Sequence, residues 1–270
     1  MRLNAVKVLG ISITNASKKE ILEEIQKYLS QLPNNRQKPL IIYTPNTEQL
    51  VLAGRNPDFA RVLNQADITL PDTVGVVWAS KILTNNSIQK PIPGVELMED
   101  LVELAATRHV PIGLIGGRGN LAVETLDCLS RRWAGLAGWA QDGPEISIHN
   151  SQFTIHNSNE KIYFERLARH IIRKDTRIVF VALGPPKQEY FIERLARELS
   201  GVILMSVGGS FDIISGRLRR APAIMRNLGL EWLWRLILEP WRICRQFALI
   251  EFVWLVLRAK LASKGDALRS

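Results

Sequence analysis

Along this chain, short apolar runs typical of buried strands are followed by turns and then by apolar positions three and four apart, as in amphipathic helices. A first helix is predicted after Ser17, because Ser17 and Glu20 have the spacing of a capping box. The expected strands span residues 39–43, 67–70, 110–115, 177–183 and 202–207. Helices are expected over 17–29, 47–63 and 74–83, and two more are expected to begin at Leu121 and at Tyr190. This alternation predicts an α/β fold, a Rossmann-like and mainly parallel sheet flanked by helices.

Two segments depart from the alternation. Residues 138–158 are polar and rich in glycine and asparagine, and we expect an irregular excursion within the sheet domain. After Ser215 the chain is apolar with interspersed arginines, and Pro240 is expected to break or kink a helix there. The pattern therefore divides the chain into an α/β domain over residues 1–215 and a basic, Trp-rich helical appendage over residues 216–270.

Charge is concentrated in the appendage. The chain has a net charge of +9, and Arg217–Ser270 supplies +7 of it together with four of the seven tryptophans. Tryptophan rings and cations suit the headgroup region of an anionic membrane, although a terminal helical hairpin packed on the sheet would have a similar composition. The longest late apolar run, 247–257, is roughly half as long as a membrane-spanning helix. We expect a peripheral contact with a membrane.

The cysteines, the histidines and the N-terminus argue against other classes. Two distant cysteines and four scattered histidines have no metal-ligand spacing, which argues against a metal site and a disulfide framework. The first residues lack the apolar stretch and cleavage site of a signal peptide. The expectation is a cytoplasmic protein without a bound metal.

Candidate chemistry gathers where the predicted strands end, which is the edge at which open parallel sheets bind ligands. The polar and glycine residues there are Thr44, Asn46, Asp72, Gly116, Gly117, Arg118, Asn120, Gly184, Pro185, Lys187, Gln188, Gly208, Gly209 and Asp212. Bare backbone N–H groups at a helix N-terminus favour a phosphate, so the glycine turns are candidate nucleotide-binding segments. Tight turns between strand and helix are the alternative, because glycine motifs have a high false-positive rate.

Asp72 is the carboxylate of greatest interest, since it directly follows Pro71 at a strand end. A carboxylate there can act as a general base and accept the proton of an attacking hydroxyl. It can also cap the helix that follows, which is a common role for aspartate. Thr44 and Asn46 could likewise be caps of the next helix and not site residues. Gln188 could be a surface residue of a helix.

Six ordered blocks resemble the WecG/TagA/CpsF glycosyltransferases, family 26. They are Tyr43–Gln49, Ala66–Asp72, Pro93–Leu97, Gly184–Glu189, Gly208–Asp212 with Arg220–Pro222, and Leu230–Arg235 with Glu239–Pro240. The resemblance implies an inverting, metal-independent transfer of a sugar from a UDP-sugar, the donor substrate, with no cofactor. The sugar is N-acetylmannosamine, its uronic acid, glucuronate or glucose. The acceptor is a polyprenyl-diphosphate-linked saccharide in the synthesis of bacterial surface polysaccharides such as teichoic acid or exopolysaccharide, at the inner face of the plasma membrane.

The resemblance also implies roles for individual residues. Asp72 matches the family's proposed catalytic base, Thr44 and Asn46 match active-site residues beside it, and Gln188 matches a glutamine of the sugar pocket. With the resemblance, the general-base interpretation of Asp72 takes precedence over the helix cap, and one aspartate can do both. Three appendage arginines match residues thought to hold diphosphate through bidentate contacts, namely Arg235, Arg242 and Arg245.

Two positions depart from the family pattern. Thr73 stands where the family often has glycine, and Pro91-Ile92 precedes the Pro93-Gly94 block where it often has a basic residue. For this region the resemblance therefore implies no donor contacts.

Two other functions compete with this one. A nicotinamide-dependent (NAD(P)) Rossmann oxidoreductase is suggested by residues 116–120, but the glycine fingerprint is incomplete and lacks the acidic residue that holds a ribose. A nucleic-acid-binding protein is suggested by the basic appendage, but its apolar content and its lack of Lys/Arg runs argue against nucleic acid. The expected partners are the UDP-sugar, the lipid-linked acceptor and an anionic membrane surface, and a homo-oligomer is left open.

Overall fold

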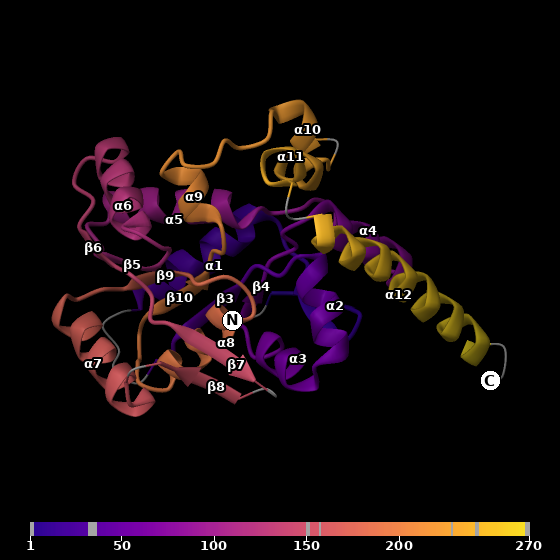
Figure 1. Cartoon of the computed structure of the whole chain (residues 1–270), viewed down its shortest axis with the longest axis horizontal. Helices are drawn as coiled ribbons and strands as arrows, with labels where there is room; N and C mark the ends of the chain where they lie inside the picture. Colours follow the sequence, from indigo (N-terminus) through magenta and orange to yellow (C-terminus); the bar gives the residue numbers. More distant parts are fainter. Residues whose placement is uncertain are drawn as a thin grey trace.

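A six-stranded, all-parallel sheet forms the centre of the computed structural model, which describes residues 3–31, 37–149, 152–156, 158–227, 229–240 and 243–267 (Figure 1). The strand order is β4-β3-β10-β9-β5-β6. The strands are β3 (Leu40–Tyr43), β4 (Ile68–Thr69), β5 (Ile112–Gly116), β6 (Gly138–Gln141), β9 (Ile178–Ala182) and β10 (Ile203–Ser206). Every residue of β5, β9 and β10 is buried, as expected for strands covered on both faces. The predicted α/β fold with a parallel sheet is confirmed.

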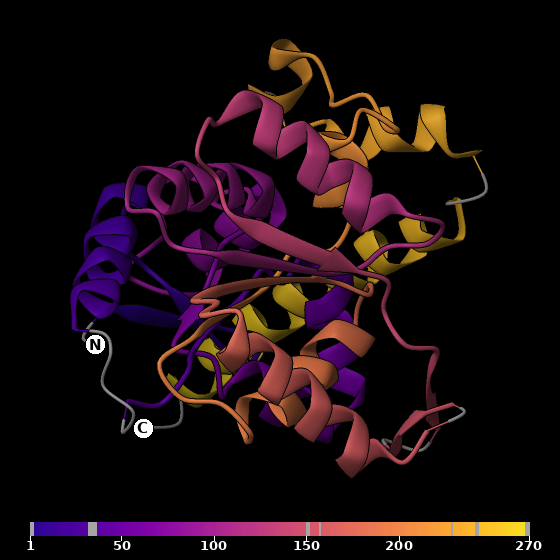
Figure 2. The ribbon, with the colours of Figure 1, turned by 90° about the vertical axis from the view of Figure 1, so that its left-hand side faces the viewer.

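Helices cover both faces of the sheet, and Figure 2 shows the sheet between the two layers. One layer contains α1 (Lys18–Ser30), α5 (Gly94–Thr107), α6 (Leu121–Arg132) and α9 (Ser210–Ile214). The other contains α2 (Thr47–Arg55), α3 (Pro57–Leu63), α4 (Val74–Leu83), α7 (Glu160–Arg173) and α8 (Lys187–Ala196). Each layer closes a separate hydrophobic core against its face of the sheet.

Most predicted helices are confirmed, but the single helix expected over 47–63 is wrong. It is divided into α2 and α3 at Asn56, because the residue before a proline avoids the helical region. Asn56 then caps α3 by accepting the N–H of Phe59 at 3.0 Å. The capping box of α1 is present as predicted, with Ser17 and Glu20 bonded to each other's backbone. Helices α5 and α7 were not predicted.

The irregular excursion expected over 138–158 is also wrong. Its first residues form the edge strand β6, and the rest contains the antiparallel hairpin of β7 (Ile146–His149) and β8 (Gln152–Ile155). Apolar residues alternate with polar ones in these short strands and bury Ile146, Phe153 and Ile155. Surrounding glycines and asparagines hide this period of two in the sequence. A second hairpin, β1 (Ala5–Val8) and β2 (Ile11–Thr14), begins the described chain.

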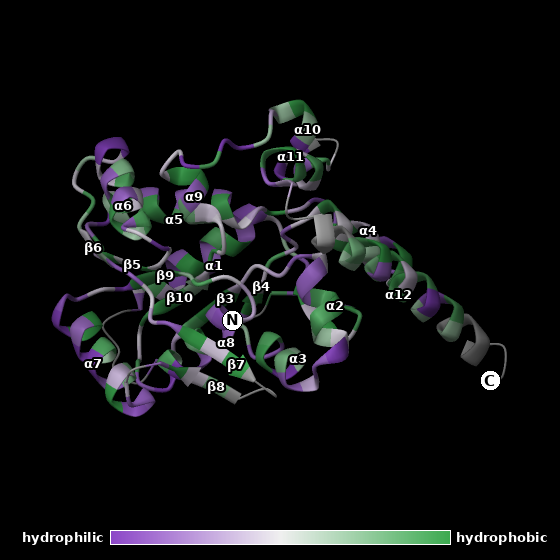
Figure 3. Ribbon diagram, viewed as in Figure 1, coloured by the Kyte–Doolittle hydropathy of each residue, from purple (hydrophilic) through white to green (hydrophobic). Residues whose placement is uncertain are grey.

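The appendage consists of α10 (Ala223–Asn227), α11 (Glu231–Leu238) and α12 (Ile243–Ala267), and α11 ends before Pro240 as predicted. Helix α12 packs on α2 and α4, where Phe252 and Val256 are fully buried and Glu251 pairs with Arg55. Figure 3 shows apolar and polar residues mixed along α12. In the parts of the chain that the structure describes, no helix has both the length and the hydrophobicity that crossing a bilayer requires.

Candidate active site

Asp72 lies just beyond β4, at the carboxyl edge of the sheet. Its Oδ1 accepts the N–H of Gly94, the first residue of α5, at 2.7 Å. The expectation that it caps the following helix is wrong, because α4 has Thr73 as its N-cap and no side-chain cap bond. The N–H of Ile92 donates to the carbonyl of Pro71 at 2.9 Å, and this bond brings the N-terminus of α5 beside the carboxylate. Asp72 therefore caps a helix that starts 22 residues later.

The surroundings of Asp72 make it a stronger base than an ordinary aspartate. The pKa of Asp72 is raised to about 6, mainly by burial and to a smaller extent by the Glu231 carboxylate, against the lowering effect of the Gly94 N–H, Arg235 and Arg220. A carboxylate with a pKa near the working pH is well suited to general base catalysis. Its charged partners Arg220, Glu231 and Arg235 all lie in the appendage.

Thr44 and Asp72 are brought together by Gly94. The Thr44 hydroxyl donates to the carbonyl of Ser206 at 3.2 Å, and its backbone N–H donates to Ser206 Oγ at 3.3 Å. A Cβ atom on Gly94 would lie 2.9 Å from Thr44 Cγ2 and 3.4 Å from Asp72 Oδ1. Only glycine therefore lets α5 approach both side chains. Asn46 has the role of a helix cap, because it forms a capping box with Gln49 at the start of α2.

Gln188 belongs to a buried polar network, so its alternative as a surface residue is wrong. Its Nε2 donates to Glu189 Oε1 at 2.8 Å, and its Oε1 accepts the N–H of Gly208 at 3.1 Å. Gln49 Nε2 donates to the same Glu189 oxygen at 3.0 Å. Burial raises the pKa of Glu189 to about 7, against the lowering effect of these amides. The network connects the turn after β9 with the turn after β10.

Arg235 reaches from α11 to the glycine turn after β10. A Cβ atom on Gly209 would lie 2.7 Å from Arg235 Nη2, so the guanidinium occupies the space above this glycine. Burial raises the pKa of Asp212, and Arg235 lowers it. Arg235, Asp72, Asp212 and the turn 208–209 therefore form one charged cluster at the carboxyl edge of the sheet.

The turn at 116–120 has a packing reason for its glycines. Gly116 has a φ of +115°, and a Cβ atom there would lie 2.4 Å from the carbonyl oxygen of Ala182. The Arg217 guanidinium donates to the Gly119 carbonyl at 2.7 Å and pairs with Glu124. The other nucleotide candidates lie in the turns that precede helices: Gly117, Arg118 and Asn120 before α6, Gly184 and Pro185 before α8, and Lys187 as the first residue of α8.

Glu96 and Ser206 contribute interactions that sequence reasoning missed. Arg220 donates to Glu96 at 2.7 Å, and Arg226 lies 3.6 Å from the same carboxylate, so the start of the appendage is paired with the first turn of α5. Arg220 also lies 3.7 Å from Glu231 of α11. Glu96 falls inside a recognised sequence block, but its partners lie more than 120 residues away, and no local pattern reveals them.

Some predicted features fall outside this description. Arg242 lies outside the described residues, and Arg245 lies in α12 without a described side chain. Within the described ranges, no three His, Cys, Asp or Glu side chains are grouped closely enough to hold a metal ion.

Comparisons with known proteins give the family to which the sequence is similar. The model of the glycosyl transferase WecG/TagA/CpsF family matches residues 6–266. The chain is 31% identical to an N-acetylglucosaminyldiphosphoundecaprenol N-acetyl-β-D-mannosaminyltransferase of Bacillus subtilis over 230 residues, 83% of this chain and 81% of the relative. A protein of the same name from Bacillus spizizenii is 30% identical over 89% of this chain and 88% of its own length. One from Staphylococcus aureus is 28% identical over 94% and 93%.

Proposed function

The chain belongs to the WecG/TagA/CpsF family of glycosyltransferases, and we propose that it transfers N-acetylmannosamine from a UDP-sugar to a GlcNAc residue carried on a polyprenyl diphosphate. The names of the relatives support this donor and acceptor. The uronic acid, glucuronate and glucose remain alternative donor sugars. The observation that carries the proposal is the Asp72 carboxylate, held by the N-terminus of α5 with a raised pKa and flanked by Arg235.

We propose a single displacement with inversion. The acceptor hydroxyl oxygen attacks the anomeric carbon, its proton passes to Asp72, and the bond from that carbon to the UDP oxygen breaks with its electron pair leaving on UDP. The backbone N–H of Gly209 and the Arg235 guanidinium offset the charge on the departing diphosphate, while the Gly208 N–H holds Gln188 Oε1. In this proposal no metal ion is needed, so we expect chelation with EDTA to leave the rate of sugar transfer unchanged.

A donor screen tests the proposed function. A panel of UDP-sugars is incubated with a polyprenyl-diphosphate-GlcNAc analogue, and release of UDP is measured with and without the acceptor. We expect UDP-N-acetylmannosamine to give the fastest acceptor-dependent release. If none of the UDP-sugars releases UDP in an acceptor-dependent manner, the proposal is wrong.

Replacing Arg235 tests its role beside the glycine turn. Arg235→Ala is expected to lower turnover by about 10- to 100-fold, because the diphosphate loses a charge-assisted bidentate contact. Arg235→Lys keeps the charge but not the two-pronged geometry of the guanidinium, so its turnover should lie between that of the wild type and that of Arg235→Ala. The rate of UDP release at saturating substrates is the measurement. Equal turnover in all three proteins would exclude a role for Arg235 in the reaction.

We further propose that α12 rests on the anionic inner face of the plasma membrane. Its exposed apolar residues Phe247, Ile250, Trp254, Leu257 and Leu261 recur every three or four positions and lie opposite the buried Phe252 and Val256. Phe247, Ile250 and Leu261 are 68–71% exposed, and the Arg258 guanidinium lies 5.2 Å from the Trp254 ring. An apolar stripe with tryptophan and arginine is typical of interfacial helices.

This location predicts a loss of vesicle binding when the stripe becomes polar. Phe247→Ser with Trp254→Ser should weaken co-sedimentation with phosphatidylglycerol vesicles by about tenfold or more, since each buried aromatic contributes about 1.5–3 kcal/mol. Val123→Ser, which removes an exposed apolar side chain (43% exposed) from α6, is the control and should bind normally. Unchanged sedimentation of the double variant would disprove the contact.

A further inference from the structure

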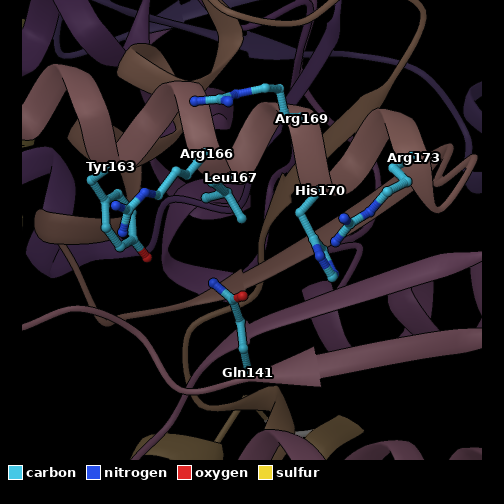
Figure 4. A pocket seen from close by; sticks show the side chains of 7 residues that line it. All are labelled: Gln141, Tyr163, Arg166, Leu167, Arg169, His170 and Arg173. Carbon is cyan, nitrogen blue, oxygen red and sulfur yellow. The ribbon is translucent and has the colours of Figure 1, made fainter.

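A hollow of about 610 Å³ lies between α7 and the edge strand β6, apart from the cluster around Asp72 (Figure 4). Seven residues line it: Gln141 from β6 and six from α7 between Tyr163 and Arg173. None of them has a carboxylate, and every polar one offers a hydrogen-bond donor, with arginine at 166, 169 and 173. The proposed transfer reaction uses none of these residues.

The cations in this hollow are not neutralised by the carboxylates around them. On α7, Glu160 pairs with Arg194 at 3.2 Å and Glu165 lies 4.0 Å from Lys161. Among the described residues, no carboxylate forms an ion pair with Arg166, Arg169 or Arg173. Three guanidinium groups without a carboxylate partner in that part of the chain favour the binding of an anion.

His170 is held firmly in the wall of this hollow. Its ring lies edge-on to Trp139 with centroids 4.6 Å apart, and Trp139 Nε1 donates to Thr176 Oγ1 at 2.7 Å. Burial lowers the pKa of His170, and the neighbouring cations Arg173 and Lys174 lower it further. Figure 4 shows His170 and Arg173 projecting from α7 toward the strand and Gln141 reaching from the strand toward α7. The donors thus converge from two sides on one space.

We propose that this hollow binds the phosphate or diphosphate group of a small molecule or a lipid headgroup. Each planar guanidinium group can bind two phosphate oxygens at once. Arg166 and Arg173 lie about two helical turns apart on α7, so that one phosphate group of a diphosphate can reach each of them. The Gln141 amide and the His170 ring add neutral donors, while Tyr163 and Leu167 give apolar surface for the rest of the ligand. Pyrophosphate contains the shared chemical group and is the first probe.

The test follows the His170 imidazole by NMR in the full chain, which has four histidines. Pyrophosphate is titrated at constant ionic strength, with sodium chloride as the control and His170→Asn to assign the resonance. The expected result is a saturable shift of the His170 signals with a raised pKa of His170, because a bound anion stabilises the imidazolium. Vesicles of phosphatidylglycerol, compared with phosphatidylcholine, show whether a lipid headgroup supplies the phosphate.

Variants connect the binding to the arginines. Arg166→Ala with Arg173→Ala should weaken pyrophosphate binding at least tenfold, whereas Arg131→Ala, an exposed arginine on α6, should not change it. Binding lost in the double variant supports the site whichever phosphate source binds. If neither pyrophosphate nor phosphatidylglycerol shifts His170 saturably, or if the double variant binds equally well, the proposal is wrong. Because no step measures sugar transfer, the result is independent of the proposed function.

Discussion

Asp72→Asn is expected to lower the rate of sugar transfer by about 10²- to 10⁴-fold, the usual contribution of a general base. The amide retains the oxygen that accepts the Gly94 N–H, so the N-terminus of α5 stays capped, but it cannot take the proton of the acceptor hydroxyl. UDP binding should remain nearly intact. The turnover rate and the UDP affinity by calorimetry, measured on the same preparation, separate loss of chemistry from loss of binding.

The matched control for this variant is Asp67→Asn at the other end of β4. Asp67 also accepts a backbone N–H, from Ile41 at 2.9 Å, but it lies before the strand and away from the carboxyl edge. Transfer by the Asp67 variant should be close to normal. Full activity in Asp72→Asn would refute the general-base mechanism.

The pH dependence follows from the raised pKa of Asp72. A general base works only when deprotonated, so kcat/KM should rise with pH through about 6 and level off above it. For stability the sign is opposite: the folded-state pKa exceeds the ordinary 3.8, so Asp72 destabilises the fold increasingly as pH rises from 3.8 to about 6. Asp72→Asn should therefore unfold no more easily than the wild type at pH 8, as denaturant titration would show.

Phe252→Ala is expected to reduce the free energy of unfolding by about 3–5 kcal/mol, because the substitution leaves a cavity in a closed core. Phe252 is fully buried between α12 and the helices α2 and α4, with its ring centroid 6.5 Å from that of Trp78. Phe247→Ala on the same helix is the control: its side chain is exposed, so its effect should stay within about 0.5 kcal/mol. Equal effects in the two variants would mean that α12 does not pack as described.

Because α12 packs on α2 and α4, the membrane binding of the appendage is better tested by point substitutions than by deletion. Deleting all residues after Ser215 would uncover the apolar surfaces of α2 and α4 that α12 buries. A loss of membrane binding in such a protein would be inseparable from damage to the core. Point substitutions on the exposed stripe avoid this problem, because they leave Phe252 and Val256 in place.

Five strands of the central sheet, β3, β4, β5, β9 and β10, were predictable because their signals are local. Each of these five is a short apolar run, and Thr44, Asp72 and the turn 208–212 follow three of them at the edge where the candidate site was expected. Helix α5 was missed because it begins at Pro93-Gly94, which has the composition of a turn, although Gly94 is what lets Thr44 and Asp72 meet at that helix.

The interactions that complete the site join distant parts of the chain. Gln49 and Glu189 are separated by 140 residues, and their hydrogen bond exists only because β3 and β9 flank the same central strand, β10. The position of Arg235 over Gly209 depends on how the appendage returns to the sheet. Sequence spacing contains no information on such contacts, so the fold was needed to place them.

Helix α12 has one buried face and one exposed apolar face, and this fixes its rotation about its own axis. Any rotation about its axis would bring Phe252 and Val256 out of the core, so the direction of the stripe from Phe247 to Leu261 is fixed relative to the sheet. Whatever surface covers the stripe therefore meets the protein at one set angle. The rotation of α12 about its axis thus determines how the carboxyl edge of the sheet, which carries Asp72, is oriented relative to that surface.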